Sequence, residues 1–257
     1  MIGGFMDNLK RCRRLALIAI GFSLLLLGCA APRTIQTHPA LSQKCQNIKS
    51  VVLAKPDIKV YLVSAGGVPE LMDEWSGLAS DNVTKAVLAQ FEGSGTKISV
   101  LKPDPQNEQE MKEVLALFPV VSSAIMRHVA PAQPGFTPSA PTTYEAGADY
   151  SVGPIPKILD PAGADALLLV HGVDQYASAG KKAVNVLGTV SGVMMSAFTG
   201  VVVVPRGEGT TLRIALVDRN GTVLWHNIKG GSTNLRDPDL AKGFVEVALD
   251  EFPGLKK

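Results

Sequence analysis

Few of the histidine, carboxylate and hydroxyl side chains in this 257-residue sequence are spaced for chemistry. His171 and Asp174 lie three apart at the end of an apolar run, and residues three apart on a strand point to opposite faces, so joint metal ligation requires a bend at Gly172. The glycine-rich stretch 93–97 follows a predicted helix, whereas a phosphate-binding loop follows a strand. The sequence contains no nucleophile elbow, no His-Glu-x-x-His motif and no dinucleotide fingerprint. We therefore expect no catalytic residue, no metal and no enzyme activity.

The three cysteines have different expected fates. Cys12 lies in a basic and apolar leader, Cys29 ends the tetrad Leu26-Leu27-Gly28-Cys29, and Cys45 stands alone in the segment leading into the predicted fold. No cysteine spacing suits a metal, and Cys45 has no partner for an internal disulfide. Two readings of Cys45 stay open: an inert thiol, or an intermolecular disulfide or redox-sensitive site.

Residues 1–28 have the order of a signal peptide, with basic residues from Lys10 to Arg14 followed by the apolar run Leu15 to Leu27. This run is shorter than the roughly 20 residues that a spanning helix needs. The tetrad before residue 30 resembles the lipobox of bacterial lipoproteins. The resemblance implies cleavage before Cys29, a diacylglycerol on its thiol and a further acyl chain, palmitate or similar, on its amino group. The alternative is an ordinary secretory signal.

In the enterobacterial sorting rule, aspartate after the lipidated cysteine favours the inner membrane, and this sequence has Ala30 there. We therefore expect the periplasmic face of the outer membrane, with the inner membrane and surface display left open. Without its leader the chain has 21 basic and 22 acidic residues, so it lacks the basic excess of a nucleic-acid-binding domain. The covalent lipid on Cys29 is the one cofactor expected.

Hydrophobic periodicity predicts an α/β (α+β) sandwich over residues 51–257, built on a mixed sheet of about five strands and preceded by a lipid-anchored tether over 29–50. Asp104-Pro105 is typical of a helix start, and Pro119 should kink or break that helix near Phe118. The residues 131–156 read as a long Pro/Gly-rich loop. The predicted strands are 51–63, 97–101, 166–170, 211–217 and 222–228, and the predicted helices are 71–91, 104–118 and one beginning at Asp237-Pro238 with the apolar face Leu240, Phe244, Val247, Ala248 and Phe252.

Asn220-Gly221 lies between the last two predicted strands and favours a two-residue type I′ turn. This hairpin, the Gly163-Ala164-Asp165 lead into a strand and the order of elements resemble the periplasmic α/β domain of the CsgG, LpoB and TolB N-terminal families. The chain is also similar to uncharacterised outer-membrane lipoprotein families that have the same hairpin. Such proteins act by contact with partners, which implies a non-enzymatic binding or assembly module in the cell envelope that contacts another envelope protein or its own copies.

One segment, Ala183 to Pro205, contains no charged residue and is rich in glycine. Its small residues recur every four positions, at Gly188, Gly192, Ser196 and Gly200. On a helix this spacing lets two backbones approach closely. Three readings stay open: a helix or hairpin packed on its own domain, an oligomerising or membrane-inserting element of a secretion pore, and a flexible arm. The CsgG family builds its pore from two inserted hairpins, and only one candidate exists here.

Overall fold

The computed structural model describes residues 35–129, 149–178, 180 and 209–255. The expected signal peptide, Cys29, the segment 183–205 with its four small residues, and most of the loop 131–156 lie outside these residues. The described part is an α/β sandwich with a mixed sheet, as the sequence predicts. In chain order its elements are β1 (Gln36–Thr37), α2 (Leu41–Cys45), β2 (Ser50–Leu53), β3 (Asp57–Val63), β4 (Pro69–Leu71), α3 (Asp73–Gln90), β5 (Lys97–Val100), α4 (Glu108–Val129), α5 (Pro156–Ala162), β6 (Ala166–Ala177), β7 (Gly209–Asp218), β8 (Val223–Gly231) and α8 (Pro238–Ala248).

The sheet is organised around the long strand β6. Its strand order is β1-β8-β7-β6-β2-β5, and β3 runs along β6 beyond the end of β2, with β4 beside β3. The strands β2 and β3 are parallel to β6, whereas β7 is antiparallel to it. The predicted strand 51–63 is thus two strands, separated at Ala54-Lys55-Pro56, that share one neighbour. The short strands β1 and β4 raise the total to eight among the described residues, against about five predicted.

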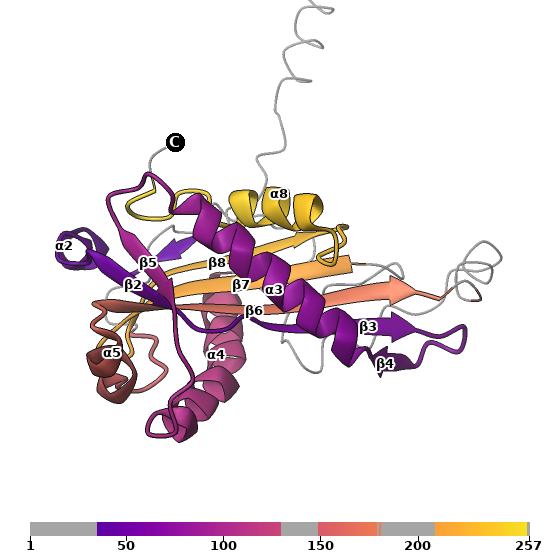
Figure 1. Ribbon diagram of the computed structural model, residues 1–257, viewed down its shortest axis with the longest axis horizontal. Helices are drawn as coiled ribbons and strands as arrows, with labels where there is room; N and C mark the ends of the chain where they lie inside the picture. The colour runs from indigo at the N-terminus through magenta and orange to yellow at the C-terminus, as the bar shows by residue number, and fades with distance from the viewer. Residues whose placement is uncertain (1–34, 130–148, 179, 181–208, 256–257) are drawn as a thin grey trace, which may run out of the picture. The chain divides into compact units, whose positions relative to one another are not determined.

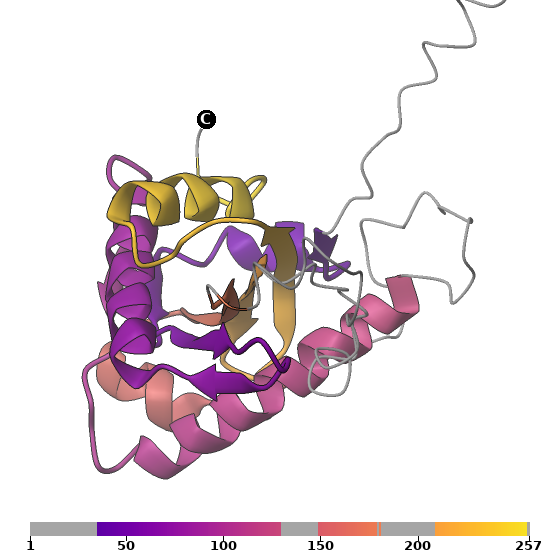
Figure 2. The same cartoon turned by 90° about the vertical axis from the view of Figure 1, so that its right-hand side faces the viewer.

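Helices cover both faces of the sheet. Figures 1 and 2 show α8 and α4 on opposite faces, and α3 lies beside α8. Side chains of β6 alternate between two cores: Leu168 and Val170 pack with α3 and α8, whereas Leu167 and Leu169 pack with α4 and α5. A strand buried on both faces must be apolar at successive positions, which explains the run Ala166-Leu167-Leu168-Leu169-Val170 and confirms it as the central strand.

The fold begins earlier than the predicted boundary at residue 51. Residues 36–45, which the sequence assigned to the tether, form β1 and α2, and Gln36 of β1 pairs with His226 of β8. Cys45 at the end of α2 packs partly buried against the core. This burial raises the pKa of the Cys45 thiol to about 11, so the reactive thiolate is disfavoured and the inert reading is favoured.

The helix α4 contradicts two predictions. It is not broken at Pro119 but continues to Val129, and it begins at Glu108, not at Pro105. The carboxylate of Asp104 accepts from the Gln106 amide at 2.9 Å, and its carbonyl accepts from Asn107, so a separate turn precedes the helix. Beyond Pro119 the helix continues because its inward side chains, Val114, Phe118, Ser122 and Ile125, are all buried against the sheet. Packing outweighs the one backbone hydrogen bond that proline removes.

The β7–β8 hairpin is present, but its turn differs from the predicted type I′. Asp218 and Thr222 close the hairpin through an Asp218 N to Thr222 O bond of 3.0 Å, which leaves a three-residue loop, 219–221. Gly221 alone in this loop has a positive φ, +78°, whereas a type I′ turn requires two such residues. The close approach of Gly153 adds a second constraint, since a Cβ on Gly221 would lie 1.8 Å from the Gly153 carbonyl oxygen.

The helix α8 begins as predicted, because the Asp237 carboxylate accepts hydrogen bonds from the amides of Asp239 and Leu240. The predicted apolar face is partly wrong. Leu240 is 50% exposed and Val247 is 47% exposed, whereas the buried residues of the helix are Ala241, Val245 and Ala248. The helix turns its small residues inward because it packs closely on α3.

Candidate functional site

The outward face of α4 is unusual for a surface helix. From Val114 to Met126 the helix has no charged residue, although only one of its faces packs on the sheet. On the opposite face Leu117 is 46% exposed and Val120 is 62% exposed. A helix that is apolar all round is typically buried on all sides. We refer to Leu117 and Val120 with their surroundings as the α4 outer face.

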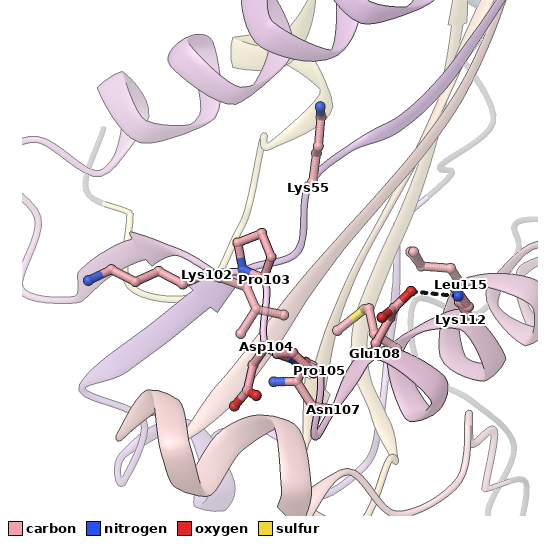
Figure 3. A pocket seen from close by; sticks show the side chains of 11 residues that line it. Lys55, Lys102, Pro103, Asp104, Pro105, Asn107, Glu108, Lys112 and Leu115 are labelled. Atoms are coloured by element: carbon pink, nitrogen blue, oxygen red, sulfur yellow. Dashed lines mark ion pairs between the residues drawn. The ribbon is translucent and has the colours of Figure 1, made fainter.

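A cavity of about 310 Å³ lies at the amino-terminal end of the same helix (Figure 3). It is formed where β2 and β5 end and α4 begins. After β2 the chain passes through β3 and β4 of the same sheet and then leads to α3 on one face, whereas after β5 it leads to α4 on the other face. Open α/β sheets bind ligands at such a change of direction. The lining residues are Lys55, Leu101, Lys102, Pro103, Asp104, Pro105, Asn107, Glu108, Met111, Lys112 and Leu115.

The cavity has an apolar lining and a charged rim. Leu101, Met111 and Leu115 supply much of the lining, and Glu108 pairs with Lys112 at 2.6 Å across one turn of α4. This pairing lowers the pKa of Glu108. In Figure 3 the ammonium group of Lys102 extends away from the other lining side chains. The lining contains lysine and carboxylate side chains but no serine, cysteine or histidine.

His171 and Asp174 do not share a site. The strand β6 is continuous from Ala166 to Ala177, so the bend required for joint metal ligation is absent. Gly172 lies between them because a Cβ there would approach Leu212 and Ile58 within 2.7 Å. His171 lies on the α4 side, 3.9 Å from Asp57, and Asp174 is buried on the α3 side. Within the described ranges, no three histidine, cysteine or acidic residues lie close enough together to hold a metal.

A second histidine, His226, has no motif in the sequence that marks it as a site residue. Its Nε2 lies 2.8 Å from the hydroxyl of Ser122 on α4, and both residues are completely buried. Burial, with a contribution from Arg213, lowers the pKa of His226 to about 3, and burial lowers that of His171 to about 4. Both imidazoles are therefore neutral. Since no substrate can reach a buried pair, we assign Ser122 and His226 a structural role. Residues Val223 to Ile228 of β8 are all buried, so no alternation of buried and exposed side chains along this strand could have marked His226.

No family model matches the sequence, and no curated protein matches it either. Among solved structures, the chain is similar to the PelC dodecamer from Paraburkholderia phytofirmans at 10% identity, covering 87% of this chain and 96% of that one with a TM-score of 0.37. A point variant of the same dodecamer gives 10% identity, 80% and 88% coverage and a TM-score of 0.28. Scores this low do not establish a common fold.

Proposed function

We propose that this protein is a lipid-anchored, non-enzymatic module of the outer membrane that binds another envelope protein on its periplasmic side. The α4 outer face carries the proposal. Leu117 and Val120 are exposed on the uncharged stretch 114–126 of α4, and their removal from water by a partner stabilises the complex by about 25 cal/mol per Å² of apolar surface. The charged residues Lys102, Glu108 and Lys112 lie near the start of the same helix. An apolar centre beside a polar rim is the usual composition of a protein interface.

The anchor rests on Cys29 and its lipobox-like context. Among the described residues no helix is both long and apolar enough to cross a membrane. Two or three acyl chains on the cysteine hold a protein at a bilayer, whereas one binds only marginally. The variant Cys29→Ser should no longer incorporate labelled fatty acid and should appear as uncut precursor or as soluble periplasmic protein. Label retained in this variant would contradict the anchor.

Site-specific photocrosslinking in intact cells tests the binding face. A photoreactive residue at Leu117 or Val120 should give one discrete adduct with a heterologous protein. Leu240 and Val247 on α8 are matched controls, because they have similar side chains and similar exposure on the opposite face of the sheet. Adducts of equal yield from both helices would contradict a specific α4 interface. A band at twice the mass of the chain would instead identify the partner as a second copy.

A further inference from the structure

Asp174 is a completely buried carboxyl group that joins three parts of the domain. Its Oδ1 lies 2.7 Å from the hydroxyl of Thr210 on β7, and its Oδ2 lies 2.6 Å from the hydroxyl of Tyr176 on β6. The amide of Leu235, in the loop between β8 and α8, donates to Oδ2 at 3.2 Å. The loop also receives two hydrogen bonds from Asn82 of α3, at 3.1 and 2.9 Å. Asp174 therefore holds the β8–α8 loop on the sheet.

Both hydroxyl groups have a second oxygen neighbour. Tyr176 Oη lies 2.6 Å from Asn234 Oδ1, and Thr210 Oγ1 lies 3.0 Å from the carbonyl oxygen of Thr233. The neighbouring atom of Asn234 must be its oxygen, because the backbone amide and the Nε of Arg236 both donate to it, at 3.2 and 3.1 Å. An amide nitrogen there would face two donors.

The hydroxyl groups of Thr210 and Tyr176 thus make four short oxygen–oxygen contacts but carry only two protons between them. Each hydroxyl has one proton to donate, so an ionised Asp174 leaves two of the four contacts without a proton. A proton on the carboxyl group supplies a third hydrogen bond, for example from Oδ1 to Thr210, whose own proton then goes to Thr233. We propose that Asp174 is a proton-binding site, and that its protonation as the pH falls fastens the β8–α8 loop to β6 and β7.

The surroundings of Asp174 support proton uptake. Val60 of β3 lies opposite it in register, and the buried α8 residues Ala241 and Val245 belong to the same apolar core. On α3, Trp75 meets the Tyr176 ring edge to face and Asn82 donates to the Leu235 carbonyl, and both of these side chains are uncharged. Burial raises the pKa of Asp174, whereas the hydrogen bonds and the charge of Arg236 oppose that rise.

The loop held in this way also carries Arg236, which stacks on two half-buried aromatic rings. The guanidinium of Arg236 lies 4.0 Å from the ring centre of Trp75 and 4.2 Å from that of Tyr176. The two rings meet edge to face, with centres 6.1 Å apart. Tyr176 also hydrogen-bonds to Asp174, so loss of the Asp174 proton weakens the hydrogen bonding of the ring on which Arg236 stacks. The proton therefore links acidity to the order of this half-buried cluster of one cation and two aromatic rings, independently of the α4 outer face.

The test compares Asp174→Asn with a matched control, Asp165→Asn, in the full chain. Asparagine copies a protonated carboxyl group, since its NH2 can donate where the acid proton would. The carboxylate of Asp165, in contrast, is hydrogen-bonded by three groups that each supply a proton: the amides of Lys49 and Ser50 and the Ser50 hydroxyl. Its ionised form therefore satisfies every one of these contacts. At pH 7.5 we expect Asp174→Asn to melt at or above the wild-type temperature, with the difference closing on acidification to pH 4.5, and Asp165→Asn to melt lower.

An Asp174→Asn variant that melts well below wild type at pH 7.5, by an amount independent of pH, would overturn the proposal. If the variant fails to fold, the wild-type protein still decides the question. Carbon NMR of its side-chain carboxyl should give Asp174 a titration midpoint above 3.8, the ordinary value. A midpoint at or below 3.8 would also overturn the proposal.

Discussion

The close approach of Gly221 to Gly153 predicts an unusually costly glycine-to-alanine substitution. In Gly221→Ala the left-handed backbone costs about 1–2 kcal/mol. The new Cβ would also lie 1.8 Å from the Gly153 oxygen and 2.4 Å from its carbon, and backbone atoms cannot rotate away. Relief requires segment 151–155 to move, which strains the bonds from Val152 N to Gly221 O and from Ile155 N to Arg219 O, both 3.0 Å. At about 0.5–1.5 kcal/mol each, these bring the expected loss to about 2–5 kcal/mol.

Thermal unfolding followed by circular dichroism measures this loss. For a domain of this size each kcal/mol lowers the midpoint by about 2–4 °C, so a loss of about 2–5 kcal/mol should lower it by about 4–20 °C. Gly163→Ala is the matched control, because Gly163 has φ +59° but its new methyl group would meet no atom within 4 Å. It should lose only the backbone cost of about 1–2 kcal/mol. Equal losses in the two variants would refute the contact between the hairpin and segment 151–155.

Three further substitutions test the cap of α8, the packing of β6 and the buried histidine. Asp237→Ala should lower the unfolding free energy by about 0.5–2 kcal/mol in urea titrations, whereas Asp239→Ala, which removes a charge but no cap, should cost less. Gly172→Ala should cost about 1–3 kcal/mol through overpacking against Leu212 and Ile58, and a wild-type midpoint would contradict the packing described. Because the folded pKa of His226 is lowered from 6.5 to about 3, its contribution to stability is complete above pH 6.5 and is lost as pH falls toward 3, by up to about 1.4 kcal/mol per pH unit. His226→Gln should flatten that part of the stability profile, and an unchanged slope would show that His226 does not titrate as described.

The sequence predicts those parts of the fold in which local chemistry and packing agree. The run 166–170 is apolar on both faces because β6 has a core on each side. Asp237-Pro238 combines a capping carboxylate with a residue that needs no backbone donor, and α8 begins there. The hairpin also follows from the sequence, although Gly221 and not the Asn-Gly pair carries the positive φ.

The remaining features depend on contacts that are distant in the chain. Pro119 has the same local preference in any helix, but the burial of Phe118, Ser122 and Ile125 decides that α4 continues. The two residues of β1 have no strand pattern, and only their pairing with Trp225 and His226 makes them a strand. The Asp174 site likewise required Thr210 and loop residues 233–236, which lie at least 36 positions away. Hydrophobic periodicity in the sequence does not indicate that these residues contact one another.

The position of β1 limits where the domain can work. If Cys29 carries lipid as proposed, seven peptide units separate it from Gln36, the first residue paired with β8. A fully extended chain spans at most about 3.6 Å per residue. The tether from residue 29 to residue 36 therefore reaches about 25 Å, whereas a free linker from residue 29 to residue 50 could reach roughly 75 Å. With such an anchor, a tether this short would keep β1 and the neighbouring β8 edge within about 25 Å of the bilayer surface, so a partner that binds this edge would have to bind it close to the membrane.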